Sequence, residues 1–325
     1  MSRRIEWPTW GVILSVYGGW LAATWAHSLV PGPLLALLGG LVVAWHGSLQ
    51  HEAVHGHPTG RRRLDALIAG APLGLWLPFP LYRLSHLAHH RTARLTDPLD
   101  DPESFYVTAE GWAAMHPLRR ALHRALSTLV GRIVLGPAWI IARFLRSELR
   151  ALARGEHVGV WAVHAAVCTL VLTWVVFVCG MSLATYLACF VYPGLSLTLL
   201  RSFAEHRPAP AADRRSAIVE AGSLLSLLFL NNNLHFVHHA APSLPWYRLP
   251  ERYRAHRTAV LDRNGGYLFA GYWNIARAYA LRSKGSPVHP GADNAPARMS
   301  SSTRTQSSPI ARSSVVTGTA SRTVS

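Results

Sequence analysis

The sequence predicts an all-α membrane protein with about four transmembrane helices in two hairpins, joined by cytoplasmic and interfacial helices that carry the histidine boxes. The first observation is four apolar stretches without a charged residue, at 10–30, 34–49, 158–180 and 181–200. Each is close to the roughly 20 residues that span a bilayer, and the second reaches that length if its helix continues toward His51. Two further observations support this fold: the positive charge lies outside these stretches, and histidine motifs follow them.

The distribution of charge indicates orientation in a membrane. The formal net charge of +16 at pH 7 could by itself indicate a nucleic-acid partner. Arginine is absent from 10–49 and 158–200, however, and frequent in 50–157 and after 200. This arrangement follows the positive-inside rule, so we expect both termini and the central segment to be cytoplasmic and no nucleic acid to bind.

Two other apolar stretches do not read as simple spans. The stretch 64–82 is interrupted by three prolines, which predicts a bent or interfacial segment. The stretch 126–143 contains Arg132 and Pro137, which predicts an amphipathic helix lying in the membrane interface.

The chain is predicted to form one membrane domain, residues 1–285, followed by a tail. Residues 286–325 are rich in Ser, Thr, Pro, Ala and Arg without periodicity. This composition predicts a disordered, low-complexity segment.

Histidines in three short motifs are the strongest functional signal. His51-Glu52-Ala53-Val54-His55 matches HExxH, which alone is typical of zinc proteases. Two HxxHH motifs follow, and each is expected by chance roughly 0.05 times in such a chain. Their residues are His86, His89 and His90, then His235, His238 and His239.

The spacing predicts a shared metal centre. Helix positions i, i+3 and i+4 lie on one face, so each motif can aim its imidazoles at a common point. All three motifs lie at cytoplasmic ends of apolar segments, so eight imidazoles can converge. A catalytic zinc takes only three protein ligands, whereas eight nitrogen donors suit two metal ions of higher coordination number.

The chain resembles the integral-membrane fatty acid desaturase and hydroxylase superfamily over about residues 10–260. The resemblance lies in the motifs "HEAVHGH", "HLAHH" and "HFVHH", in their order along the chain and in their position after paired membrane hairpins. The resemblance implies a non-haem di-iron centre that uses O2 and two electrons to attack an unactivated C–H bond. It also implies that the iron ligands are His51, His55, His86, His89, His90, His235, His238 and His239. His206 in "RSFAEHR" stands where relatives often add a ligand, and Asn231, Asn232 or Asn233 could act through water.

The resemblance also implies a substrate class and partners. "LTDPLDDPES" and "HHAAPSLPWYRLP" resemble a bacterial branch that acts on acyl chains or small amphiphiles, and the second also resembles carotenoid ketolases and hydroxylases. Desaturation of a fatty acyl or lipid-like substrate is the first expectation, and hydroxylation or ketolation of a lipid or carotenoid is the alternative. The chain has no cytochrome b5-like motif and no cysteine cluster, so electrons must come from a separate ferredoxin or cytochrome with its reductase. Its arginine-rich face suits docking of an acidic carrier, and the expected location is the bacterial inner membrane.

Two other classes fit less well. An intramembrane zinc protease built on His51, Glu52 and His55 would need a third ligand, but 158–200 holds no acidic residue. That reading also leaves six motif histidines without a role. A membrane cytochrome would place its axial histidines singly on facing helices.

The remaining histidines are not expected to be ligands. His27, His46 and His164 read as core residues, and His57 lies off the helix face of His55. We expect the others to be surface residues: His116, His123, His157, His256 and His289. Four acidic residues after the second motif could orient imidazoles or form a solvated turn, and the sequence leaves both open: Asp97, Asp100, Asp101 and Glu103. Trp246 and Tyr247 are expected at a substrate entrance or in an interfacial aromatic belt.

Overall fold

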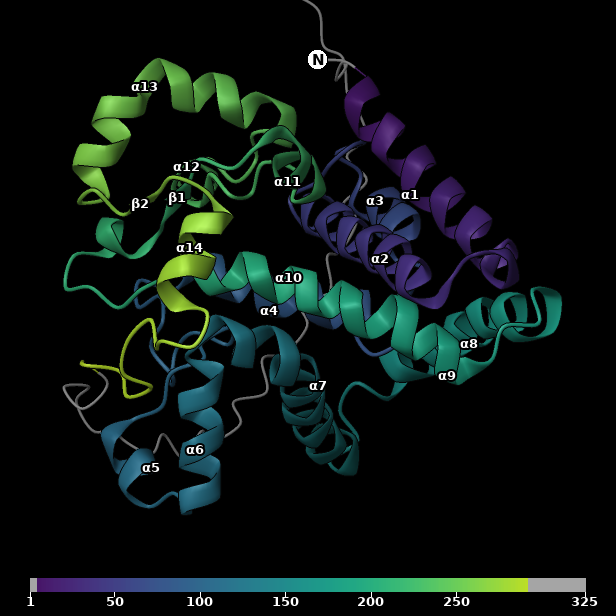
Figure 1. The fold of residues 1–325 in the computed structure, drawn as a ribbon, viewed down its shortest axis with the longest axis horizontal. Helices are drawn as coiled ribbons and strands as arrows, with labels where there is room; N and C mark the ends of the chain where they lie inside the picture. Colours follow the sequence, from purple (N-terminus) through teal and green to yellow (C-terminus); the bar gives the residue numbers. More distant parts are fainter. Residues whose placement is uncertain (1–4, 292–325) are drawn as a thin grey trace, which may run out of the picture. The chain divides into compact units, whose positions relative to one another are not determined.

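The computed structural model describes residues 5–291 and is mostly helical (Figure 1). This confirms the all-α fold. The α-helices are α1 Trp7–Trp25, α2 Gly32–Val54, α3 Arg62–Ala69, α4 Phe79–Arg91, α5 Ala109–Ala113, α6 Pro117–Leu126, α7 Leu129–Ala153, α8 Val158–Leu172, α9 Leu183–Tyr186, α10 Tyr192–Glu205, α11 Ser223–Leu228, α12 His235–Ala240, α13 Leu249–Arg263 and α14 Tyr272–Tyr279. Short 3-10 or π segments are η1 His27–Leu29, η2 Thr173–Val178, η3 Leu187–Val191, η4 Ala212–Arg215 and η5 Trp246–Arg248, and the strands are β1 Ile218–Val219 and β2 Leu268–Phe269.

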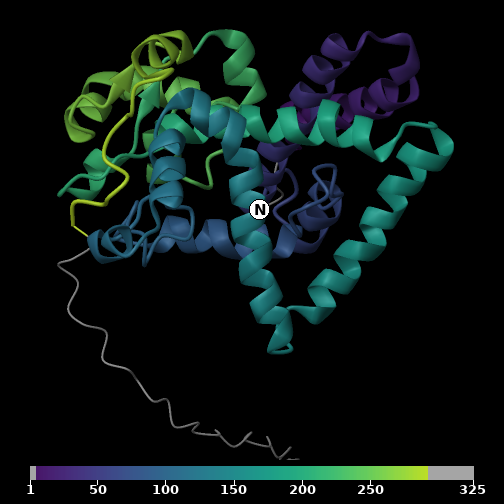
Figure 2. The same cartoon turned by 60° about the horizontal axis from the view of Figure 1, so that its bottom comes forward.

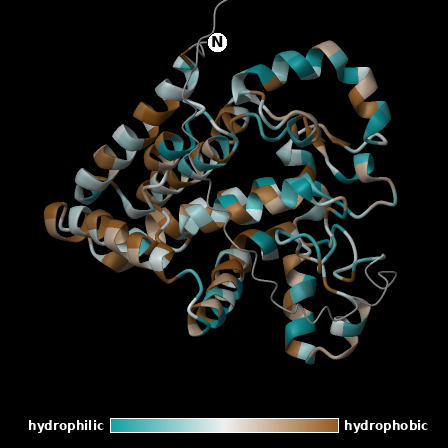
Figure 3. Cartoon of the chain, turned by 180° about the vertical axis from the view of Figure 1, so that it is seen from behind, coloured by the Kyte–Doolittle hydropathy of each residue, from teal (hydrophilic) through white to brown (hydrophobic). Residues whose placement is uncertain are grey.

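Within residues 5–291, three helices are long and apolar enough to cross a membrane. They are Gly32–Val54, Val158–Val178 and Leu183–Glu205. The second predicted span does continue through His51, as its length required. The first predicted span lies largely in α1, which is not one of these three helices. Its four tryptophans contribute little to the mean hydropathy of the helix. Figure 3 shows the hydrophobic colour dominating α8, while α13 is largely hydrophilic.

The first hairpin packs closely on the second. Where α2 meets η3 and α10, a Cβ added at Gly194 would lie 2.6 Å from Val43 Cβ, and one at Gly39 would lie 2.5 Å from a backbone oxygen. Only glycine permits this approach. Trp20 Nε1 donates to Tyr186 Oη at 3.0 Å, which joins the two hairpins through buried side chains.

The region between the hairpins differs partly from its prediction. Residues 64–82 do not span, as predicted: α3 ends at Ala69 and α4 begins at Phe79. The predicted helix 126–143 is in fact α7, a longer helix of 25 residues. Helices α6 and α7 meet at 118° and would provide a fourth span if they acted together. In Figure 2, α7 and α8 diverge from the turn at 154–157.

The C-terminal third folds over the ends of α2 and α10 that lead to the histidine motifs. Strands β1 and β2 form a two-stranded parallel sheet, with Ile218 paired to Leu268 and Val219 to Phe269. A buried group of apolar side chains includes Phe203 of α10, Phe229 after α11 and Ile275 of α14, so this third is packed onto α10. It thereby holds α12 against the ends of α2 and α4.

The packed chain continues past the predicted boundary at 285. Val288 forms a parallel bridge with Val107, and the N–H of His289 donates to the carbonyl of Val107 at 2.9 Å. The rest of the predicted tail, 292–325, lies outside the described residues.

Candidate metal centre

The first motif lies at the end of α2. His51 belongs to the last turn of the helix and is only 1% exposed, while His55 is the residue that follows the helix. The helix ends here because Gly56 adopts φ +90° and Pro58 cannot continue a helix. The two rings remain neighbours, with centroids 5.0 Å apart.

The other motifs lie on short helices aimed at the same place. Helix α4 carries the second motif and begins with a proline in its first turn, where the missing N–H costs nothing. Helix α12 carries the third motif in only six residues. His206 follows α10 with extended backbone (φ −130°, ψ 151°), which turns its side chain away from the helix axis.

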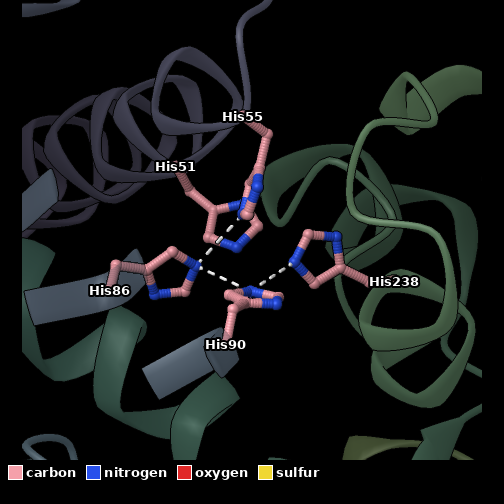
Figure 4. Close-up of side chains that lie close together, drawn as sticks. All are labelled: His51, His55, His86, His90 and His238. Carbon is pink, nitrogen blue, oxygen red and sulfur yellow. Dashed lines mark hydrogen bonds between the residues drawn. The ribbon is translucent and has the colours of Figure 1, made fainter. Parts of the chain in front are cut away.

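The structure brings all nine predicted histidines into two clusters. The first comprises His51, His55, His86, His90 and His238; the second comprises His89, His206, His235 and His239. Within each cluster the candidate ligand atoms all lie within 4.8 Å of one another. Figure 4 shows the five rings of the first cluster turned toward one point. Their role as metal ligands stays a prediction.

The nitrogen spacing fits coordinated metal ions. A metal–nitrogen bond of about 2.1 Å with ligands at right angles places neighbouring nitrogens about 3.0 Å apart. In the first cluster, His86 Nε2 lies 3.2 Å from His55 Nε2 and 3.1 Å from His90 Nε2. In the second, His235 Nε2 lies 2.9 Å from His206 Nε2 and 3.0 Å from His239 Nε2. Imidazole lone pairs facing one another at these distances are stabilised by a cation between them.

Burial keeps most of these imidazoles neutral. Burial is the main cause that lowers the pKa of His55 to about 2, and those of His90 and His206 to about 3. A neutral imidazole offers the lone pair that a metal ion requires. The donor set therefore suits metal binding at neutral pH.

Two carboxylates orient the second motif from behind. Glu103 Oε1 accepts from His86 Nδ1 at 2.9 Å, and Asp101 Oδ1 accepts from His89 Nδ1 at 2.8 Å, so both Nε2 atoms face the centre. Burial opposes protonation of His89, but Glu103 and Asp101 outweigh it and raise its pKa to about 9. The two carboxylates thus favour positive charge at the second cluster. The other two candidates, Asp97 and Asp100, pair with Arg94 instead.

A buried polar group joins the two clusters. Asn232 Oδ1 lies 3.1 Å from His235 Nδ1 and its Nδ2 lies 3.5 Å from His51 Nε2. Glu205 Oε1 accepts from Asn232 Nδ2 at 3.3 Å and pairs with Arg201 at 2.8 Å. Asn232 is therefore the asparagine at the centre, while Asn231 and Asn233 donate to backbone carbonyls. Because the three asparagines are adjacent, sequence alone could not separate them.

The other histidines lie outside the clusters. His164 contacts the Leu75 carbonyl at 2.8 Å, and His57 Nδ1 lies 2.8 Å from Glu6 Oε1 behind the first motif. The prediction that His123 is a surface residue is wrong, since it is buried with its ring 5.1 Å from Trp139. Trp246 is also buried rather than at an entrance or belt, and its backbone N–H donates to Glu52 Oε2 at 3.1 Å.

Two cavities approach the clusters. The larger, about 1270 Å³, lies among α2, α4, α7 and α10 and reaches His86 and Glu103. Apolar side chains such as Val43, Ile140 and Leu195 line it. Its lining also includes four exposed arginines of α6 and α7: Arg119, Arg143, Arg146 and Arg150. The smaller cavity, about 80 Å³, is lined by polar and apolar groups alike and lies beside His206 of the second cluster.

Comparison with known proteins gives consistent results. A profile described as fatty acid desaturase matches residues 23–271. A beta-carotene ketolase of Paracoccus sp. (strain N81106 / MBIC 01143) is 26% identical over 260 residues, covering 72% of this chain and 88% of that protein. A beta-carotene ketolase of Paracoccus sp. (strain PC1) is 27% identical over 262 residues, covering 74% and 86%.

Proposed function

Because the chain belongs to the fatty acid desaturase family, we propose that it is a membrane oxidoreductase that desaturates a fatty acyl or lipid-like substrate with O2 and two electrons. The observation that carries this proposal is the pair of all-histidine clusters beside a large, largely apolar cavity. Two iron ions would be held by His51, His55, His86, His90 and His238, and by His89, His206, His235 and His239. When bound, they supply the activation of O2 that removes hydrogen from an unactivated carbon.

The overall reaction balances with an external electron donor. The substrate loses two hydrogens from neighbouring carbons as one C=C bond forms. O2 takes up these hydrogens together with two protons and two electrons from the donor, and leaves as two waters. The chain's own groups hold the imidazoles in place through Asp101, Glu103 and Glu205, and the apolar cavity walls exclude water from the substrate.

The cavity supports an acyl substrate with an acidic head. Its apolar part suits a hydrocarbon chain, and four exposed arginines in its lining suit a carboxylate or phosphate. A pure hydrocarbon would make no use of their positive charge.

A second candidate is ketolation or hydroxylation of a carotenoid. Its support is the two Paracoccus relatives, which are named as beta-carotene ketolases. Desaturation and these reactions share the first hydrogen removal and differ in whether oxygen is transferred to carbon.

The protease alternative fits the geometry poorly. Glu52, the expected base, accepts the backbone N–H of Trp246 at 3.1 Å, and His51 and His55 share their cluster with three further histidines. A zinc ion with three protein ligands would not use this donor set.

We place the centre and both termini on the cytoplasmic side of the bacterial inner membrane. The support is the restriction of arginine to one side of the hairpins. We also propose that a separate acidic ferredoxin or cytochrome, supplied by its reductase, docks on the cytoplasmic arginines. Arg252, Arg254 and Arg257 of α13 are exposed and suit such a partner. An electron-transfer rate that is insensitive to ionic strength would contradict this docking mode.

The proposal is tested by metal analysis and product analysis together. The purified full chain should contain two irons, and Mössbauer spectroscopy should show them to be paired. Membranes of a host that makes both acyl lipids and β-carotene should then be compared between the wild-type chain and His89→Ala. A lipid lacking two hydrogens supports desaturation, and a carotenoid that gains oxygen supports the second candidate. One zinc and no iron would refute both.

A further inference from the structure

The segment 284–289 lies directly against the second cluster, although the predicted tail begins within it, at residue 286. Lys284 is the only lysine in the chain, where every other basic side chain is arginine. The Lys284 backbone N–H donates to the Ser127 carbonyl at 2.9 Å, which fixes the segment beside α7.

The Lys284 side-chain nitrogen is directed at the end of α10. Its Nζ donates to the Phe203 carbonyl and, at 2.8 Å, to the His206 carbonyl. These are the oxygens left unpaired where the helix ends, and the helix dipole favours a cation there. The same Nζ lies 5.3 Å from the Phe203 ring and 5.9 Å from the Tyr267 ring. The compact head group of a lysine suits this space better than a planar guanidinium would.

The next residues tie the segment to the loop that carries Asp101 and Glu103. The Val107 N–H donates to the Pro287 carbonyl at 3.0 Å, and Thr96 Oγ1 lies 3.1 Å from His289 Nε2. The Thr96 N–H in turn donates to Asp101 Oδ2 at 2.8 Å. One short segment therefore contacts the backbone of His206 and, through Thr96, the carboxylate that orients His89.

We propose that Lys284 is a positioning residue that fixes His206, and through the segment 284–289 also His89, for metal binding at the second cluster. This inference rests on the proposed function, because His206 is a ligand only if the second cluster holds a metal ion. It assigns the segment to the second cluster, because its contacts reach His206 directly and His89 through Thr96 and Asp101.

The test is metal content per chain of purified full-length variants. Wild type should contain two metal ions and Lys284→Met about one, while Arg282→Met, an exposed neighbour, should keep two. His239→Ala should also reduce the content to about one, and adding Lys284→Met should remove no more. When Lys284→Met is combined with His51→Ala and His55→Ala, almost no metal should remain bound.

Each contrary result has a distinct meaning. Two metal ions in Lys284→Met would overturn the inference and leave the proposed function intact. Fewer than two in wild type would contradict the proposed function instead. Equal loss from both clusters would show that Lys284 serves general stability and would also overturn the inference.

A second measurement uses the wild-type chain and decides the matter if Lys284→Met does not fold. Because Lys284 is the only lysine, an amine-reactive reagent can modify only this side chain and the terminal amine. If Lys284 fixes His206, binding of metal must in turn hold Lys284, so chelation should increase its labelling several-fold. Equal labelling with and without metal would overturn the inference.

Discussion

Replacement of Asp101 by asparagine tests whether the carboxylates behind the imidazoles hold the metal centre. Asp101 is 4% exposed, and its Oδ1 accepts from His89 Nδ1 at 2.8 Å and from the Glu103 N–H at 2.9 Å. Its Oδ2 accepts from the Thr96 N–H at 2.8 Å. An asparagine can keep its oxygen toward His89 and Glu103, but its amide nitrogen then faces the N–H of Thr96.

The expected magnitude follows from these contacts. A buried N–H left without an acceptor costs about 1–3 kcal/mol. Loss of a carboxylate that orients a metal-binding histidine typically weakens metal affinity by about 10–100-fold. Asp101→Asn should therefore lower the apparent melting temperature and release metal at about 10–100-fold lower chelator concentration.

The matched control is Asp100→Asn in the same loop. Asp100 pairs with Arg94 at 3.2 Å. Retained metal is measured by mass spectrometry along a chelator titration of the purified chain. If Asp101→Asn and Asp100→Asn release metal alike, the argument that Asp101 orients His89 is refuted.

Three further predictions concern packing, the cavity and pH. Gly194→Ala should lower the apparent melting temperature, because the added Cβ would lie 2.6 Å from Val43 Cβ. Gly11 has open space around it, so Gly11→Ala should leave the melting temperature unchanged. Equal melting temperatures of the two variants would contradict the packing argument. Gly47→Leu should reduce turnover of long substrates while two metal ions remain bound, since Gly47 lines the large cavity; unchanged turnover would place the substrate elsewhere. Hydrogen bonds from Arg257 and Tyr253 lower the pKa of Glu220 in the folded protein below its ordinary value of about 4.3. Ionised Glu220 should therefore stabilise the fold above about pH 4.3, and this stabilisation should be lost as the pH falls through the lower pKa of the folded state. The Glu220→Gln variant should therefore have a lower melting temperature than wild type at pH 7 and the same melting temperature in strong acid. A difference in melting temperature that does not change with pH would contradict this.

Local spacing and charge were sufficient to predict the hairpins and the convergence of the motifs. The end of α10 was harder, because sequence neighbours on a regular helix point about 100° apart, so Glu205 and His206 would diverge if the helix continued through both. The extended backbone at His206 ends the helix there, so Glu205 contacts His235 Nδ1 at 3.4 Å while His206 enters the second cluster. Neither β1 nor β2 could be predicted, since each has two residues and depends on a partner about fifty positions away.

The division of the nine histidines between the clusters was also beyond the sequence, yet it follows a simple geometric rule. In every motif the histidines at i and i+4 share a cluster: His51 with His55, His86 with His90, and His235 with His239. The histidine at i+3 points to the other cluster, so His89 joins the second and His238 joins the first. On a helix, i+3 and i+4 are separated by one residue step of about 100°, enough to place their imidazoles on opposite sides of a midpoint. Each HxxHH helix therefore bridges both clusters and fixes the distance between them, whereas an HxxxH motif can serve only one. The second cluster consequently receives only three histidines from the two HxxHH motifs, and His206 supplies the fourth. A histidine outside the motifs is therefore needed, and the contacts that hold His206 in place matter for this cluster.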